Sequence, residues 1–285
     1  MINQRFFSLP VLIVFLAAFS LLPSCKQEQR ARKMPESVSA YVYGYTSGIV
    51  SRAAPIRVRF ATLAAEESAI GQEADSRLLS FSPTIAGTAT WEDAQTLRFD
   101  PSEPLSSGTA YVATVNLKKI LPEVPDEAAS FEFDFRTRDQ YFDLSVDGIS
   151  AANPRNLSKQ ELHGYLFTAD MAEAEAVEAV LSARQQGRKL PIRWSHSAEG
   201  MEHYFYVQDI NRGDQASVVE LSWAGKPLGV TVSDSREVEV PAIDDFKVTN
   251  ARAVQGQDQY IQLHFSDPLL ESQSLEGLVS IPGYG

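Results

Sequence analysis

The feature that most constrains the fold of this chain is a strict alternation of apolar and polar residues. It is clearest in three segments: Ile56–Phe60, Leu97–Phe99 and Phe131–Phe135. Successive side chains of a β-strand point to opposite faces, so this pattern predicts antiparallel strands with one buried face. Short runs rich in Pro, Ser and Gly separate the segments and predict turns. About seven short strands between Ser39 and Thr137 suit one immunoglobulin-like β-sandwich, which we place at residues 38–139.

The alternation continues from Tyr141 to about Pro241 and predicts a second β-sandwich at residues 140–242. One segment differs. Thr168–Arg184 is rich in Ala and Glu, and Met171, Ala174, Val177 and Leu181 share one helical face. Gly187 is expected to stop the helix, so we expect one short helix that crosses between strands. The expected strands are Phe142–Val146, Glu161–Phe167, Leu190–Trp194, Tyr204–Val207, Ser217–Trp223 and Glu237–Val240.

A third block begins at Ile243 and contains two strand candidates, Asp245–Asn250 and Gln259–Phe265, before a last apolar run at Leu278–Ile281. So few strands leave sheet edges and a core face open to water. We therefore expect residues 243–285 to be the start of a third, incomplete β-module, and the chain to be a fragment of a longer protein. A swapped element is the alternative. The predicted fold class is all-β, with tandem immunoglobulin-like or macroglobulin-like antiparallel β-sandwiches.

The N-terminus carries the pattern of an exported bacterial lipoprotein. Arg5 precedes an apolar stretch from Phe6 to Leu22, which is marginal for a spanning helix and typical of a signal peptide. The stretch ends at Leu22-Pro23-Ser24-Cys25, which resembles a bacterial lipobox, with Leu22 three residues before Cys25 and the small Ser24 directly before it. The resemblance implies cleavage before Cys25 and acylation of its thiol and new amine. A plain secretory signal with an incidental cysteine is the alternative.

These features divide the N-terminal region into two parts. Residues 1–24 are the predicted signal peptide, and residues 25–37 are a polar tether that the lipid on Cys25 would anchor to the bilayer. Lys26 stands where an inner-membrane retention signal has Asp, which favours the outer membrane of a bacterial cell envelope. Either face of that membrane is compatible with the sequence.

Charge and cysteine content exclude several classes of function. The chain has 25 Lys and Arg against 37 Asp and Glu, a net charge of −12, so it repels phosphate backbones and we expect no nucleic-acid partner. Its single cysteine, Cys25, excludes a disulfide framework and a multi-thiolate metal site. The sequence has no Gly-x-Ser-x-Gly elbow. We expect no catalytic residue, no metal and no cofactor, and therefore not an enzyme.

Scattered histidines and paired acids suggest only weak alternatives. The spacing of His196 and His203 closely fits neither a helix face nor a metal-binding hairpin, and His163 and His264 stand apart. The acid pairs Glu66-Glu67 and Asp244-Asp245 are interpreted as solvated loop charges rather than as a calcium site.

Three further motifs have a structural and a functional interpretation. Arg212-Gly213-Asp214 is the tripeptide that integrins recognise, but between two strands it is an ordinary turn. Asp267, before Pro268, is expected to initiate a turn rather than bind a ligand. Three tryptophans would make a sugar-binding platform if exposed, but their alternating strand context predicts core positions: Trp91, Trp194 and Trp223.

Three stretches in order behind the lipobox resemble the N-terminal region of bacterial alpha-2-macroglobulins. They are Trp91 to Tyr111 with Leu97-Arg-Phe99-Asp-Pro101, Leu190 to Gly225 with Tyr204-Phe-Tyr-Val207 and Leu221-Ser-Trp223, and Ile261 to Leu269 with Asp267-Pro268. The resemblance covers about residues 38–285. It implies macroglobulin-like domains in a large envelope protein, which traps a protease by collapsing around it after a bait segment is cut.

Part of the family's chemistry has no counterpart in this sequence. Many members form a thioester from a Cys-x-Glu-Gln motif, whereas Cys25 is followed by Lys-Gln-Glu. No bait segment is recognisable. We therefore expect the chain to be the anchor and scaffold region of a broad endopeptidase inhibitor, with the bilayer as partner through acylated Cys25 and proteases as partners through a downstream region. The alternative is a stand-alone surface lipoprotein whose immunoglobulin-like modules bind a glycan or a protein.

Overall fold

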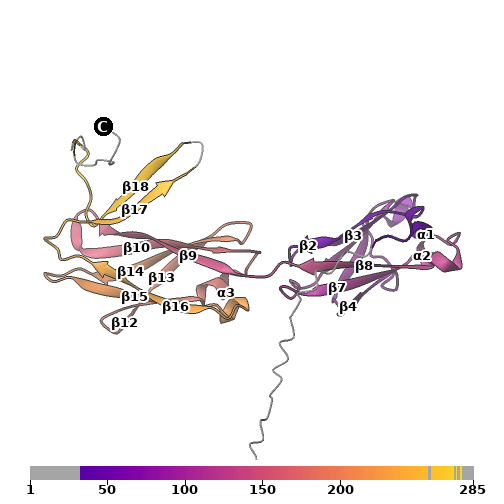
Figure 1. Ribbon diagram of the computed structural model, residues 1–285, viewed down its shortest axis with the longest axis horizontal. Coiled ribbons are helices and arrows are strands. Elements are labelled where there is room, and N and C mark those ends of the chain that lie inside the picture. The colour runs from indigo at the N-terminus through magenta and orange to yellow at the C-terminus, as the bar shows by residue number, and fades with distance from the viewer. Residues whose placement is uncertain (1–32, 256–257, 273, 275–276, 278–285) are drawn as a thin grey trace, which may run out of the picture. The chain divides into compact units, whose positions relative to one another are not determined.

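The computed structural model describes residues 33–255, 258–272, 274 and 277, and in them the chain is all-β (Figure 1). The first β-sandwich has two four-stranded sheets, in the orders β1-β3-β6-β5 and β2-β8-β7-β4. All its strand pairs are antiparallel except β2–β8, which is parallel. The strands are β1 (Val42–Tyr45), β2 (Gly48–Val50), β3 (Ile56–Phe60), β4 (Leu79–Ser82), β5 (Gly87–Asp93), β6 (Thr96–Pro101), β7 (Ala110–Asn116) and β8 (Ser130–Thr137).

The core of this sandwich is formed by the apolar residues of the predicted alternating strands. Ile56, Val58 and Phe60 of β3 are fully buried, while Arg57 and Arg59 between them are not. On the facing sheet, Phe131, Phe133 and Phe135 of β8 join the same core. Two facing rows of alternating side chains are thus sufficient to bury one face of each sheet.

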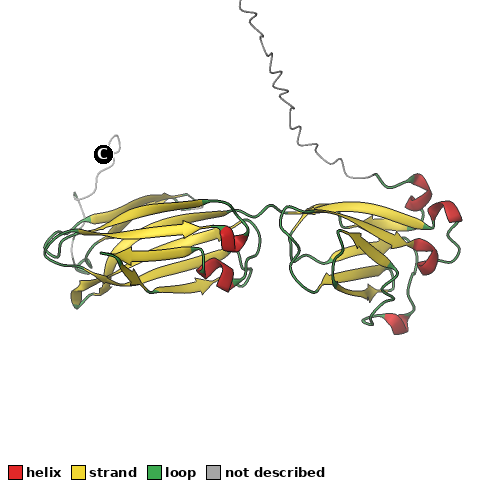
Figure 2. Ribbon diagram, turned by 90° about the horizontal axis from the view of Figure 1, so that it is seen from below, coloured by secondary structure: helices red, strands yellow, loops and turns green. Residues whose placement is uncertain are grey.

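The second β-sandwich also has two four-stranded antiparallel sheets, in the orders β13-β14-β10-β9 and β12-β11-β15-β16. Figure 2 shows the layered strands of both sandwiches. The strands are β9 (Phe142–Asn153), β10 (Asn156–Thr168), β11 (Leu181–Gln185), β12 (Arg188–Leu190), β13 (Ile192–His196), β14 (Glu202–Asn211), β15 (Ser217–Ala224) and β16 (Ser233–Val240).

The short helix in the second sandwich is confirmed, but it is smaller than the sequence indicates. Helix α3 spans only Ala174–Glu178, and Leu181–Gln185 forms strand β11 instead of continuing the helix. The residues of β11 alternate between buried and more accessible positions, which suits a strand. Gly187, expected to stop a helix, lies with Gln186 in the turn between β11 and β12, where both have positive φ angles.

The predicted strand Leu190–Trp194 is divided in the structure. Leu190 ends β12 in one sheet, and Ile192 begins β13 in the other. Pro191 lies between them, and its missing N–H cannot contribute to a ladder of hydrogen bonds. The proline therefore sits where the chain leaves one sheet for the other.

The remaining strands form a two-stranded antiparallel sheet of β17 (Val248–Val254) and β18 (Tyr260–Phe265). The side chains of Thr249 and Asn250 donate hydrogen bonds to the carbonyl oxygens of Ile149 (2.9 Å) and Asp147 (2.7 Å) in β9. This hairpin therefore has one face turned toward the second sandwich. The other short helical segments are α1 (Glu36–Ser39), α2 (Leu117–Ile120), η1 (Glu67–Ala69), η2 (Asp126–Ala128) and η3 (Lys226–Leu228).

Candidate functional site

The predicted lipidation site, Cys25 with Leu22 and Ser24, lies outside the described residues. Its acylation therefore stays a prediction. Within the described part of the chain, no helix has the length and apolar character needed to cross a membrane.

The structure brings His196 and His203 together, which their spacing did not indicate. The two residues are direct cross-strand partners in the β13–β14 ladder. Their Nδ1 atoms are 2.8 Å apart, and the Nε2 atom of His196 lies 3.2 Å from a carboxylate oxygen of Glu178 in α3. A hairpin with a five-residue loop thus pairs two histidines that are seven positions apart.

The hydrogen-bonding capacity of these groups fixes the tautomers when both rings are neutral. The Glu178 carboxylate only accepts, so His196 donates from Nε2 and accepts at Nδ1, and His203 donates from Nδ1. The Nε2 atom of His203 then holds a lone pair, and it is buried without a hydrogen-bond partner. Burial, reinforced by the nearby charge of His196, lowers the pKa of His203 to about 4.

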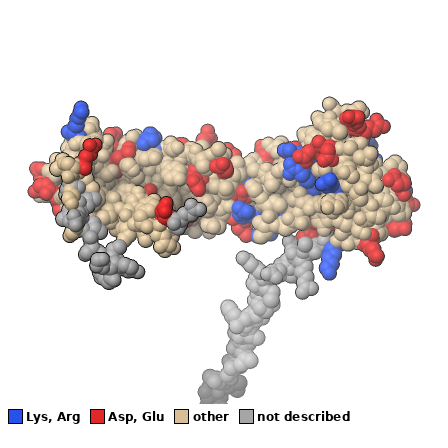
Figure 3. Space-filling view, turned by 90° about the horizontal axis from the view of Figure 1, so that it is seen from above, with Lys and Arg blue, Asp and Glu red and all other residues tan. Residues whose placement is uncertain are grey.

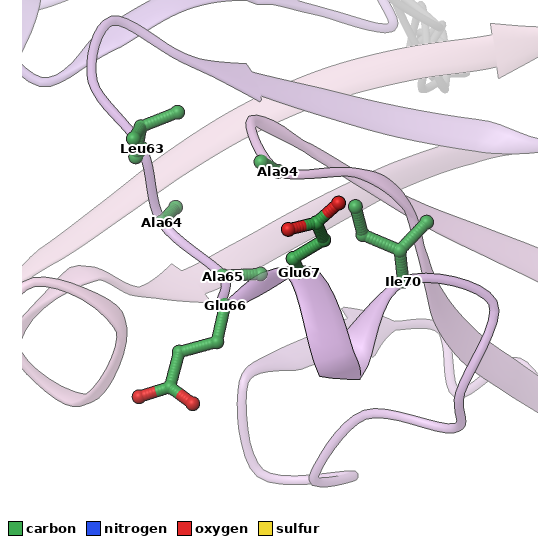
Figure 4. A pocket seen from close by; sticks show the side chains of 7 residues that line it. All are labelled: Leu63, Ala64, Ala65, Glu66, Glu67, Ile70 and Ala94. Carbon is green, nitrogen blue, oxygen red and sulfur yellow. The ribbon is translucent and has the colours of Figure 1, made fainter.

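These groups do not make a metal centre. Among the described residues, no cluster of three or more His, Cys, Asp or Glu side chains is arranged to hold a metal ion. Glu66 and Glu67 line an open hollow of about 760 Å³, together with Leu63, Ile70 and three alanines. Figure 4 shows the Glu66 side chain pointing away from that of Glu67, so the two carboxylates do not converge.

Arg212 of the Arg-Gly-Asp tripeptide is buried instead of exposed. Its guanidinium donates hydrogen bonds to the carboxylate of Asp267, at 2.6 and 3.1 Å. It also donates to backbone carbonyl oxygens of Pro241 (3.1 Å), Ala242 (2.8 Å) and Asp245 (3.0 Å). Since none of the Arg212 side chain is accessible, the tripeptide does not present the cation that a receptor would need.

Asp267 takes a structural role in the same network. Burial alone would raise the pKa of Asp267, but hydrogen bonds from Arg212 and Ser266 outweigh burial and hold this pKa below its usual range. The carbonyl oxygen of Ser266 also accepts a hydrogen bond from the buried Gln160 side chain of β10, at 3.1 Å. Arg212 and Asp267 therefore join the segment after β18 to the second sandwich. The sequence suggested only a turn at Asp267.

The three tryptophans pack into the cores and form no exposed platform. Trp91 is buried in the first core, and Trp194 and Trp223 pack against the second core. In the described fold these three tryptophans are therefore core residues, as their alternating strand context predicts, rather than a sugar-binding platform. Exposed aromatic surface occurs elsewhere, on the outer side of the sheet β13-β14-β10-β9.

We call this surface the tyrosine face and define it as Tyr165 and Phe167 of β10 with Tyr204 and Tyr206 of β14. Tyr165 and Tyr204 are direct cross-strand partners. Their neighbours in sequence, such as Leu166 and Phe205, are fully buried, so alternation turns the four aromatic rings outward. Tyr204 is the most open of them, with 44% of its surface accessible.

Two arginines lie against the tyrosine face. The guanidinium of Arg193, in β13, is 3.9 Å from the centre of the Tyr206 ring. That of Arg252, in β17, is 5.9 Å from the centre of the Tyr165 ring and 3.2 Å from a carboxylate oxygen of Asp147. The face therefore already binds cations within the molecule.

A hollow of about 330 Å³ opens on this face. It is lined by Asp143, Tyr165, Leu166, Phe167, Glu202 and Tyr204. Phe167 stands between the two acids, because its cross-strand partners are Asp143 on one side and Glu202 on the other. The negative charge of Glu202 raises the pKa of the Tyr204 hydroxyl.

Sequence reasoning missed the tyrosine face, although a signal was present. Tyr204-Phe205-Tyr206 is a run of three aromatic residues in one strand. Because successive residues of a strand point to opposite faces, such a run supplies aromatic side chains to the outside as well as to the core. The other predicted strands alternate apolar with charged residues, so a run of three aromatic residues stands out from them in the sequence.

No family model matches the chain, and no curated protein matches it. Among solved structures, L,D-transpeptidase 3 from Mycobacterium tuberculosis is 14% identical, with a TM-score of 0.25 over 44% of this chain and 46% of that chain. An L,D-transpeptidase from Mycobacterium smegmatis is 12% identical, with a TM-score of 0.25 over 82% of this chain and 76% of that chain. Protocadherin gammaB7 is 12% identical, with a TM-score of 0.22 over 77% of this chain and 54% of that chain. This chain thus spans less than half of the first structure, and at such identities and TM-scores the matches assign it no activity and no partner.

Proposed function

We propose that this chain is the anchor and scaffold region of a bacterial envelope protein that resembles alpha-2-macroglobulin, and that it is not itself an enzyme. In this proposal acylated Cys25 holds the protein at the outer membrane, and the β-sandwiches carry a downstream region that traps proteases. The choice of family rests on the sequence resemblance. The β17–β18 hairpin supplies the structural support.

The hairpin is amphipathic: one face is polar and the other is apolar, as in a single sheet of a β-sandwich. Its polar face, with Asn250 and Arg252, hydrogen-bonds to β9. The opposite face carries apolar side chains, among them Val248 and Ile261, whose surfaces are 51% and 48% accessible. Cross-strand pairing assigns this apolar face to Val248, Ala251, Ala253, Ile261, Leu263 and Phe265.

An apolar face of this kind is costly to leave in water, because each exposed aliphatic side chain forgoes about 1.5–3 kcal/mol of burial free energy. The described residues leave Val248 and Ile261 half exposed, which supports the proposal that residues 243–285 begin a third β-module. The ion pair of Arg212 and Asp267 then joins the second module to the third. A series of modules joined in this way suits a scaffold.

The size of the native protein tests this proposal. Membranes of the source bacterium are solubilised in detergent and blotted with an antibody raised against this chain. A band several times heavier than 31.4 kDa supports a scaffold within a larger trap protein. A band near 31.4 kDa, or slightly lighter after signal removal, would exclude the protease trap.

The tyrosine face favours a second candidate function, a surface lipoprotein that binds a partner. Large contiguous apolar patches on soluble proteins often mark interaction sites, and here one exposed ring, Tyr204, lies among three partly exposed ones. Acidic side chains are spread over the face of the molecule seen in Figure 3 rather than gathered in one patch. Recognition at the tyrosine face would depend on the aromatic rings together with Asp143 and Glu202, which line the hollow beside them.

A further inference from the structure

We propose that the hollow beside Tyr204 binds an arginine or lysine side chain from a basic peptide segment of a partner protein. The inference deepens the second candidate function by naming the chemistry of the partner. This binding proposal does not depend on the protease-trap proposal. The size of the native protein tests the protease trap, whereas a peptide-binding assay tests the binding proposal.

The chemistry of the hollow suits a cation. Tyr165, Phe167 and Tyr204 offer aromatic rings, whose faces carry negative electrostatic potential. Asp143 and Glu202 lie on either side of Phe167 in the sheet and supply carboxylates that accept hydrogen bonds from a guanidinium or an ammonium. No Lys or Arg lines the hollow within the described part of the chain, and the Glu202 carboxylate there accepts a hydrogen bond of 3.4 Å from the Tyr204 hydroxyl.

The same sheet already shows this mode of binding twice. Arg193 lies over Tyr206, and Arg252 lies over Tyr165 while it pairs with Asp147. In the second case an aromatic ring and a carboxylate hold one guanidinium together. The hollow repeats that combination in Tyr204 and Glu202, with Phe167 and Asp143 beside them, and no arginine is among the described residues that line it.

The overall charge of the chain favours the same class of partner. At a net charge of −12 the protein attracts basic segments and repels anionic glycans and nucleic acids. A neutral sugar could use the aromatic rings but would gain nothing from the net negative charge. The charge therefore favours a basic peptide over a glycan.

The test measures binding of a fluorescein-labelled peptide of alternating Gly and Arg to the full chain in non-ionic detergent, by fluorescence anisotropy. Tyr204→Ala and Glu202→Gln are each expected to weaken binding by about three- to tenfold, in keeping with the size of a cation–π contact and a partly exposed ion pair. Binding is also expected to weaken as salt rises from about 50 to about 300 mM, because exposed charges are screened.

Matched variants and probes separate the outcomes. Tyr43→Ala and Glu220→Gln remove an exposed tyrosine and an exposed glutamate outside the tyrosine face, and both should leave binding unchanged. A peptide with citrulline in place of arginine should bind at least about tenfold more weakly, because citrulline has the same shape without the charge. Equal binding of the two peptides would overturn the proposal.

Two other outcomes would also overturn it. One is Tyr204-dependent binding of chitohexaose, a neutral oligosaccharide, without binding of the arginine peptide, which would make the face a glycan platform. The other is binding that neither Tyr204→Ala nor Glu202→Gln alters. If Tyr204→Ala lowers the unfolding temperature, Glu202→Gln, which changes one exposed group, still decides the question.

Discussion

At the scale of single residues, the His203 ring combines full burial with an unsatisfied nitrogen. Protonation would charge a ring that is buried away from water, and would place a second positive charge beside His196 whenever that ring is charged. These two effects outweigh the backbone carbonyl of Gly200, which favours the protonated form. The pKa of His203 therefore falls from 6.5 in the unfolded chain to about 4 in the folded one. Between these pH values the unfolded state binds a proton that the folded state excludes, so the free energy of unfolding decreases as pH falls.

We predict that this single group makes the second sandwich less stable by about 2 kcal/mol at pH 5 than at pH 7, since one pKa unit corresponds to about 1.4 kcal/mol. Urea unfolding of the wild type and of His203→Leu at both pH values measures the effect. The substitution removes the titrating ring, so the stability advantage of the wild type over the variant should shrink by that amount at pH 5. Parallel pH profiles of the two proteins would contradict the prediction.

Gly164 lies in β10 at a buried position, and its missing side chain makes room for a neighbour. A Cβ atom at this position would overlap the ring of Phe205 and the carbonyl oxygen of Ser145. Gly164→Ala is therefore expected to lower the free energy of unfolding by about 1–3 kcal/mol through overpacking. The matched control is Gly213→Ala, where no atom lies within 4 Å of the added carbon, and urea unfolding should separate the two variants. Equal stabilities would show that β10 and β14 move apart without cost.

At the scale of elements, alternation predicted most strands because one face of each sheet is buried. The helix prediction is wrong at Leu181–Gln185, because the Ala- and Glu-rich sequence before this segment favours a helix while the segment itself forms β11. Intrinsic helix propensity is worth only tenths of a kcal/mol per residue, and the pairing of β11 with β12 and β15 outweighed it. The histidine pair and the tyrosine face depend on strand register, which residue spacing alone does not determine.

The β17–β18 hairpin is attached to the second sandwich by side-chain hydrogen bonds to β9 and by one buried ion pair, Arg212–Asp267. In Asp267→Asn the buried guanidinium of Arg212 keeps its carbonyl partners but loses its counter-charge, which costs about 3–5 kcal/mol at buried sites. We predict that hydrogen-exchange protection is lost in β17 and β18 while β10 and β14 keep theirs.

Asp147→Asn is the control for this prediction. It removes the carboxylate that pairs with Arg252 at a more exposed position, where an ion pair is worth at most about 1 kcal/mol. The hairpin should stay protected in this variant. Equal loss of protection in both variants would mean that the Arg212–Asp267 pair has no special role in attaching the hairpin.

At the scale of the whole molecule, the proposed attachment of the protein to a membrane depends on a single side chain. The thiol of Cys25 is the only one in the chain, and it directly follows the predicted signal peptide. We predict that the wild-type protein, expressed in a bacterium, incorporates radiolabelled palmitate and sediments with the membranes. Cys25→Ser should lose the label completely, because a serine hydroxyl is too weak a nucleophile to take the lipid at this position.

The size of the Cys25→Ser product distinguishes the two interpretations of the N-terminus. If the segment is a lipoprotein signal, cleavage follows lipidation, and the variant keeps residues 1–24 and migrates more slowly than the wild type. If it is a plain secretory signal, the variant is cleaved like the wild type, neither protein carries palmitate, and the envelope anchor is lost from the proposed function. Ser8→Ala, a change within the same apolar stretch, should leave both labelling and cleavage intact, because it preserves the apolar segment and the cysteine.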